Sequence, residues 1–110
     1  MKSSKEFLSG TLATLILALL KENGKMYGYE ICQLTKAKTN EEILLTEGAI
    51  YPALHKLEKK GLIISTKEKV NGRVRKYYAI PKESQSVVDS QIELLSAFIK
   101  NLNSLLKPSV

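Results

Sequence analysis

The sequence has one cysteine, one histidine and no tryptophan among its 110 residues, and these scarcities exclude several classes of protein. A single cysteine cannot form an intrachain disulfide, so the fold must be stable without one, as is typical of a reducing compartment. One histidine and one cysteine are too few for a structural metal site. The sequence also lacks a glycine-rich phosphate-binding loop and a clustered catalytic triad, so we expect no cofactor and no enzymatic activity.

Long hydrophobic runs are also scarce. Residues 12–20 form an apolar run that is too short to span a bilayer, which needs about 20 residues. Lys2 and Lys5 precede this run as in a signal peptide, but no small-residue cleavage site follows it. We therefore interpret the run as part of a buried amphipathic helix, and we expect a cytoplasmic protein with no membrane partner.

The rest of the composition is typical of one globular domain, with 44% hydrophobic and 25% charged residues. The net charge of +6 is concentrated in one segment. Residues 61–81 contain five basic residues and one acid, Glu68, which gives this segment a net charge of +4. A concentration of positive charge favours a polyanionic partner. The basic residues are Lys67, Lys69, Arg73, Arg75 and Lys76.

Hydrophobic periodicity predicts three helices in the first half of the chain. Apolar residues at helical spacing predict helices over residues 5–21 and 27–37. A third helix is expected to follow Thr46, a natural N-cap, and to end at Gly61. Pro52 lies inside this third helix, where a proline loses a hydrogen bond, so a start at Pro52 itself is the competing interpretation.

A β-hairpin is expected next. Residues 63–70 and 73–80 flank Asn71-Gly72, a strong two-residue hairpin signal. A two-residue turn places Glu68 opposite Arg75, which is favourable. It also places Lys67 opposite Lys76, which destabilises an isolated hairpin and suits a ribbon that binds phosphate.

The last helix is expected over residues 84–106, with a length of about 34 Å. Its apolar residues follow a heptad spacing, with a second apolar line beside the first, so one line can pack within the chain and the other on a partner. We predict that this helix makes a dimer, assisted by the first helix. The predicted interface residues are Leu12, Ile16, Val88, Ile92, Leu95, Phe98, Ile99, Leu102 and Leu106.

Three helices followed by a basic ribbon are the element order of a winged helix-turn-helix. The predicted fold is therefore mainly α with a β-hairpin wing: a DNA-binding unit over residues 1–81 and a C-terminal dimerisation helix over residues 82–110, forming one compact unit. The third helix would enter a major groove. Its outward face carries a glycine for close approach, a histidine for a base edge and lysines for phosphates, namely Gly48, Pro52, His55, Lys56 and Lys59.

Four segments carry a family resemblance: residues 27–31 (Tyr-Gly-Tyr-Glu-Ile), 47–54 (Glu-Gly-Ala-Ile-Tyr-Pro-Ala-Leu), 56–63 and 72–78. In this order and spacing they resemble the PadR family of bacterial transcriptional regulators. The resemblance implies a homodimeric repressor that binds operator DNA and is released by a small-molecule effector, which we place at the dimer interface. It also implies a third helix that runs through the Tyr-Pro pair, which favours the start at Thr46.

The resemblance also gives the tyrosines near the helix-turn-helix a role. Phenolic hydroxyls can bind backbone phosphates, although their rings can equally belong to the core. Some relatives hold planar drugs between tryptophans of the last helix, but Leu95 occupies the matching position here. The predicted DNA contacts are Tyr27, Thr46, Gly48, Tyr51, Pro52, His55, Lys56, Lys59, Lys67, Lys69, Arg73, Arg75 and Lys76. The alternative function is a winged-helix protein-interaction module without DNA binding, against which the basic wing argues.

Overall fold

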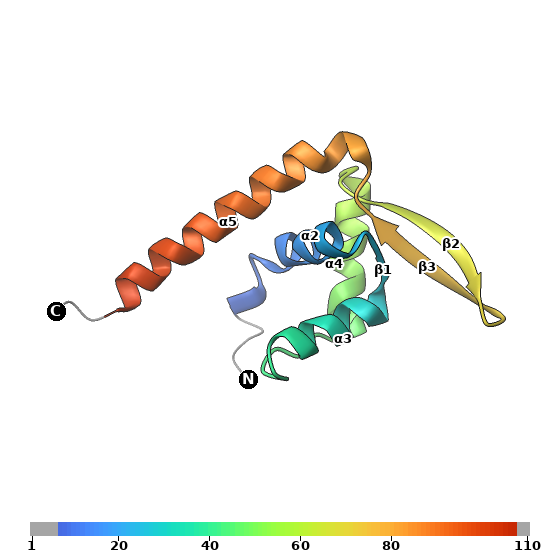
Figure 1. Cartoon of the computed structure of the whole chain (residues 1–110), viewed down its shortest axis with the longest axis horizontal. Coiled ribbons are helices and arrows are strands. Elements are labelled where there is room, and N and C mark those ends of the chain that lie inside the picture. Colours follow the sequence, from blue (N-terminus) through green and yellow to red (C-terminus); the bar gives the residue numbers. More distant parts are fainter. Residues whose placement is uncertain (1–6, 108–110) are drawn as a thin grey trace.

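The computed structural model describes residues 7–107, and two long elements extend from a cluster of three helices (Figure 1). The first of these elements is the hairpin of β2 and β3, which we call the wing, and the second is the last helix, α5. In chain order the elements are α2 (Leu12–Asn23), β1 (Lys25–Tyr27), α3 (Gly28–Lys38), α4 (Glu47–Lys59), β2 (Ile64–Val70), β3 (Arg73–Ala79), a 3-10 turn (Lys82–Ser84) and α5 (Gln85–Leu106).

The core lies where α2, α3, α4 and the sheet meet. Ile16, Leu17 and Leu20 of α2 are buried because they share the face of the helix that packs inward. Cys32 of α3, which follows Ile31, is also buried. The other buried apolar residues are Met26, Ile31, Ile50, Leu54, Leu57, Ile63, Tyr78, Ile80 and Val88.

The first helix is shorter than predicted. The predicted start at residue 5 lies outside the described residues, and a turn over residues 9–11 separates helical Phe7 and Leu8 from α2. The Thr11 amide and hydroxyl both donate to the carbonyl of Leu8, at 2.9 and 3.3 Å. Gly10 within this turn favours the break, because glycine costs about 1 kcal/mol relative to alanine in a helix.

The sheet has three strands in the order β1-β3-β2, where the sequence predicted only a hairpin. Strand β1 pairs antiparallel with β3, with Met26 opposite Tyr78 and Tyr27 opposite Tyr77. Its three residues are too few to show an alternating pattern in the sequence. The strand nevertheless ties the start of α3 directly to the wing.

Helix α4 begins after Thr46, as the first of the two interpretations predicted. The Thr46 hydroxyl accepts a hydrogen bond from the Ala49 amide at 3.2 Å. Pro52 lies inside the helix and does not end it. At the other end Gly61 has a φ of +77°, and the Leu62 amide donates to the carbonyl of Leu57 at 3.0 Å, which is a Schellman motif.

The wing has the predicted register. Val70 lies opposite Arg73, Glu68 opposite Arg75 and Lys67 opposite Lys76. Asn71 and Gly72 have φ values of +50° and +79°, as a type I′ turn requires at both central positions.

The environment of α5 differs between its two ends. The helix has 22 residues and a length of about 33 Å. Its first turns pack against α2, and Val88 is fully buried there. Val88 and Ile16 therefore belong to the core of this chain, and their predicted place at a dimer interface is wrong. The spacing placed both residues on an inward face correctly, but the chain itself covers that face at this end of the helix.

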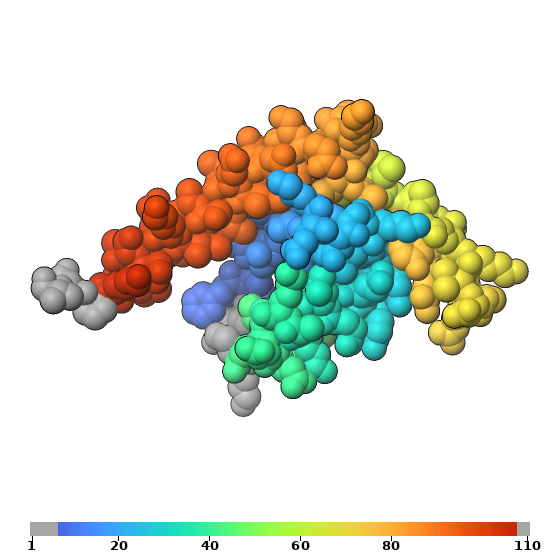
Figure 2. Space-filling model, in the orientation of Figure 1, coloured from blue at the N-terminus to red at the C-terminus, as the bar shows by residue number. Residues whose placement is uncertain are grey.

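The second half of α5 leaves the domain, and Figure 2 shows it extending well beyond the helix cluster. Leu12 and Ile92 are partly buried against the core, and Leu95 is half-buried. Beyond them Phe98, Ile99, Leu102 and Leu106 are 55%, 53%, 40% and 81% exposed. Within residues 7–107, no helix is both long enough and apolar enough to span a membrane.

Candidate nucleic-acid interface

The outward face of α4 has the composition that its helical periodicity predicts. Ile50, Leu54 and Leu57 point into the core, and the opposite side of the helix faces solvent. Among the described residues, no acidic side chain pairs with Lys56 or Lys59. The exposed residues of this side include the predicted contacts Thr46, Gly48, Tyr51, Pro52, His55, Lys56 and Lys59.

Tyr51 lies where α3 and α4 meet. Its ring rests on Gly28, and a Cβ atom at Gly28 would lie only 2.8 Å from the Tyr51 hydroxyl. This close approach explains why a glycine stands between Tyr27 and Tyr29. The Tyr51 hydroxyl donates to Glu47 Oε1 at 3.3 Å, and the side chain remains 45% exposed, so it is not a core residue.

The electrostatics around Tyr51 keep its hydroxyl protonated. Burial raises the pKa of the phenol, and the neighbouring Glu47 carboxylate raises it further. A phenol is already protonated at neutral pH, and this shift moves the Tyr51 hydroxyl further from ionisation. A donor at the surface of α4 is suited to a phosphate oxygen.

The register divides the basic residues of the wing between two faces, because residues directly opposite each other share a face. Lys67, Lys69 and Lys76 lie on the face that continues from buried Tyr78. Arg73 and Arg75 lie on the other face. The sequence predicted these five residues as one group, but the structure presents two surfaces.

Lys67 and Lys76 lie opposite each other as predicted, and an acidic residue of α4 reduces the repulsion between them. Lys76 Nζ lies 3.8 Å from Glu58 Oε1 of α4 and 5.5 Å from the centre of the Tyr78 ring. Lys67, Lys69 and Arg73 have no acidic partner in the part of the chain that the structure describes. These three side chains therefore keep their charge available to another molecule.

Tyr27 lies at the junction of β1 and α3, where it is the N-cap residue of α3. Its backbone amide donates to Glu30 Oε1 at 3.1 Å, and its half-buried ring meets Tyr77 edge to face at 5.4 Å. Glu68 faces Arg75 in the register, but its carboxylate pairs with Lys25 of β1. Sequence reasoning missed Lys25 because nothing local in the sequence reveals that β1 lies beside the wing.

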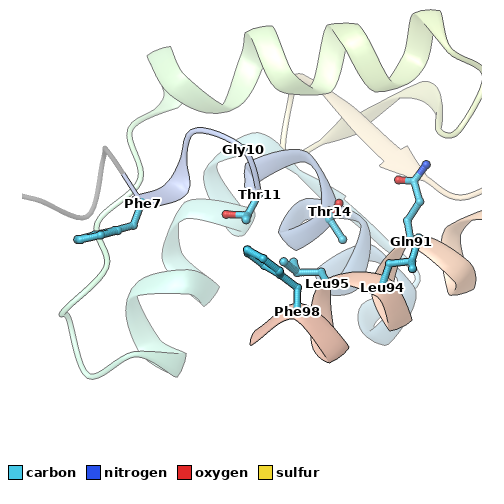
Figure 3. Close-up of a pocket in the computed structure, with 8 residues that line it drawn as sticks. All are labelled: Phe7, Gly10, Thr11, Thr14, Gln91, Leu94, Leu95 and Phe98. Atoms are coloured by element: carbon cyan, nitrogen blue, oxygen red, sulfur yellow. The ribbon is translucent and has the colours of Figure 1, made fainter. Parts of the chain in front are cut away.

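A separate cavity of about 500 Å³, widely open to solvent, lies between the start of α2 and α5 (Figure 3). Leu94, Leu95 and Phe98 line it from α5, and Thr11 and Thr14 line it from the other side. Residues 7–107 contain no group of three or more histidine, cysteine, aspartate or glutamate side chains that could hold a metal ion.

Comparison with known proteins identifies the family. The model of the "Transcriptional regulator PadR-like family" matches residues 16–88. The chain belongs to the PadR-like family. A protein from Lysinibacillus sphaericus with the name "Uncharacterized protein X" is 30% identical over an alignment of 105 residues, and the alignment covers 88% of this chain and 95% of that protein.

Solved structures agree with this assignment. A transcriptional regulator from Clostridium thermocellum has a TM-score of 0.79 and 33% identity, covering 93% of this chain and 99% of that chain. A PadR-like transcriptional regulator from Bacillus cereus has a TM-score of 0.75 and 27% identity, covering 94% and 99% of the two chains. The winged-helix fold and the DNA-binding regulator predicted from the sequence are thereby confirmed. PadR-like proteins are regulators, and this chain is not an enzyme.

Proposed function

We propose that this PadR-like chain is a homodimeric repressor that binds operator DNA in the cytoplasm through α4 and the wing. The observation that carries the proposal is the set of exposed cations without acidic partners on these two elements. Lys56 and Lys59 lie on α4, and Lys67, Lys69 and Arg73 lie on the wing. Exposed cations that are not paired with an acid can neutralise phosphates and release the counterions that surround DNA.

The contacts divide by chemistry. Helix α4 would lie in a major groove, where His55 reaches a base edge and the exposed Gly48 lets the backbone approach. Thr46 would donate to a phosphate near the start of α4, and Tyr51 would do so by exchanging its bond to Glu47 for a phosphate oxygen. Tyr27 is proposed for the same role from the neighbouring α3. Pro52 and Lys76 complete the surface, Pro52 by contact and Lys76 by charge.

The dimer would form through α5. The described part of the chain leaves Phe98, Ile99, Leu102 and Leu106 exposed, and an apolar helix surface of this kind marks an interaction site. A second copy is the simplest partner, since each α5 would cover the other in a two-fold arrangement. Leu12, Ile92 and Leu95 would border the interface where α5 meets α2.

A small-molecule effector would bind in the cavity between α2 and α5, beside this proposed interface. Leucine and phenylalanine side chains supply most of its lining from α5, while Thr11, Thr14 and Gln91 supply hydrogen-bonding groups. Such a mixture suits a mostly apolar molecule with a few polar atoms. Binding there would release DNA by changing how the two copies of α5 meet.

A gel-shift experiment on DNA from the promoter region of its own gene tests the proposal, and a footprint follows on the bound fragment. We expect saturable binding and a two-fold symmetric footprint with half-sites about 10 bp apart, or a multiple of it. Addition of compounds from a panel should release the DNA when an effector is present. Equal affinity for promoter and random DNA would contradict the proposed repressor.

A further inference from the structure

A cluster of charged and aromatic side chains joins the wing to the start of α3, on the outer face of the sheet. We propose that Lys25, Glu68, Arg75 and Tyr27 form a latch that holds the wing in position, so that Lys25 and Arg75 are positioning residues rather than phosphate contacts. This inference rests on the proposed DNA binding for its effect on affinity. Its geometry, however, is a property of the chain alone.

The first half of the latch is an ion pair between β1 and β2. Lys25 Nζ lies 2.5 Å from Glu68 Oε2 and 5.1 Å from the centre of the Tyr77 ring. The hydrogen bond to Glu68 raises the pKa of the Lys25 ammonium group. Because β3 lies between β1 and β2, this pair spans the whole width of the sheet.

The second half is a stack between β3 and β1. The Arg75 guanidinium carbon lies 4.5 Å from the centre of the Tyr27 ring, within cation–π distance. Tyr27 is in turn held at the start of α3 by its amide bond to Glu30 and by the edge contact with Tyr77. Arg75 therefore connects the wing to the helix-turn-helix through one aromatic ring.

The location of these contacts explains what they stabilise. Strand β1 pairs with β3 only as far as Tyr77, so the rest of the wing is a two-stranded ribbon. A two-stranded hairpin is marginally stable in water and lacks a fixed direction of its own. Glu68 and Arg75 are opposite each other just beyond the end of β1, and both reach back to it.

The latch also accounts for an acid in a basic segment. Glu68 is the one acid among residues 61–81, and a carboxylate near DNA repels phosphates. Its pairing with Lys25 neutralises that charge and gives the acid a structural role. Lys67 and Lys69, by contrast, have no acidic partner within residues 7–107 and point away from this cluster.

The substitution Glu68→Gln distinguishes a positioning role of the latch from an effect of net charge alone. Removing a negative charge should tighten DNA binding if only net charge matters. A latch predicts the opposite, a loss of about two- to fivefold, because an exposed ion pair makes only a modest contribution. The control is Glu83→Gln, which makes the same charge change in the 3-10 turn before α5. Tighter binding by the Glu68→Gln variant would overturn the latch.

A double-mutant cycle sharpens the test. Lys25→Gln should weaken binding by the same factor as Glu68→Gln, and the double variant should bind no worse than either one, because the two residues act as a unit. Arg75→Gln should weaken binding without changing the slope of log affinity against log salt. A slope reduced by about one per substituted arginine would make Arg75 a phosphate contact and contradict the proposal.

Hydrogen exchange tests the latch without DNA. The amides of residues 67–76 should exchange faster in the Glu68→Gln and Arg75→Gln variants than in the unsubstituted protein, while amides of α2 should not change. Unchanged exchange in the wing would overturn the latch even when DNA binding weakens. Failure of the unsubstituted protein to bind DNA would instead refute the proposed function and leave this measurement intact.

Discussion

Two elements project from the same domain, and their exposed surfaces have opposite chemistry. The wing presents Lys67, Lys69 and Arg73 to solvent, whereas the second half of α5 presents Phe98, Ile99 and a series of leucines. Charged side chains are well hydrated without a partner and can bind an anion when one is present. A contiguous apolar surface on an exposed helix, by contrast, marks an interaction site.

The two projections also differ in how far the chain itself covers them. Three strands and the contacts to Glu58 and Lys25 hold the wing within one chain. After Leu95, α5 has only exposed positions among its described residues. We therefore expect a partner of the wing to be recognised by charge and a partner of α5 to be recognised by apolar surface.

The largest expected difference is in salt dependence: salt should weaken DNA binding strongly and dimerisation through α5 hardly at all. We expect operator affinity to fall about 10³- to 10⁵-fold between 50 and 200 mM salt, as for proteins that make about 6–10 phosphate contacts. The dimer dissociation constant should change little over the same range, because apolar burial is not screened by salt. Fluorescence anisotropy with labelled operator and sedimentation equilibrium measure the two quantities. If operator affinity and the dimer dissociation constant changed equally with salt, the proposed difference between a charged wing and an apolar α5 surface would be wrong.

The substitution Phe98→Asp should weaken the dimer about 10³-fold. Each copy loses the burial of a large side chain, worth about 2 kcal/mol, and a symmetric interface contains the substitution twice. Sedimentation equilibrium gives the association constant, and Ser104→Asp is the matched control because it adds the same charge to the polar side of α5. Dimers of Phe98→Asp at micromolar concentration would place the interface elsewhere.

The fold was predictable wherever the signal is local. Asn71-Gly72 sets the register of the wing because a two-residue turn leaves no other pairing, and Thr46 begins α4 because its hydroxyl caps the first turn. Strand β1 was not predictable, since its pairing depends on residues far along the chain. Likewise, heptad spacing identified the apolar faces of α5 but not which part the chain itself covers, so Val88 was misplaced.

The candidate site also divides into features that local sequence predicts and features that depend on tertiary structure. The exposed cations of α4 and the wing could be listed from the sequence because helix and strand periodicity determine which side chains face solvent. The distribution of wing charges over two faces needed the register, and the pairing of Lys25 with Glu68 needed the third strand. Contacts between distant segments depend on tertiary structure, which no local pattern contains.

The substitution His55→Ala should reduce specificity more than affinity for random DNA. His55 is exposed on α4 opposite the buried leucines, and its proposed role is a contact with a base edge in the major groove. A lost base contact costs about 1–3 kcal/mol, so the ratio of operator to random-DNA affinity should fall about 5- to 150-fold. Competition gel shifts measure this ratio. A uniform loss on both DNAs would mean that His55 contacts the backbone instead.

Arg73→Ala should produce the smallest change, and its nature identifies the role of the wing. Arg73 directly follows the turn at Asn71-Gly72, is exposed and has no acidic partner among the described residues. Removing a phosphate contact weakens binding to all sequences alike and lowers the salt slope by about one per contact, or about two per dimer. The measurement is operator and random-DNA affinity across a salt series, beside Val74→Ala, which removes an exposed apolar side chain from the same strand. Because Val74 carries no charge, its substitution should leave the slope unchanged. An Arg73→Ala protein with unchanged affinity and slope would exclude Arg73 from the contacts with DNA, and Lys67 and Lys69 would remain as the candidate contacts of the wing.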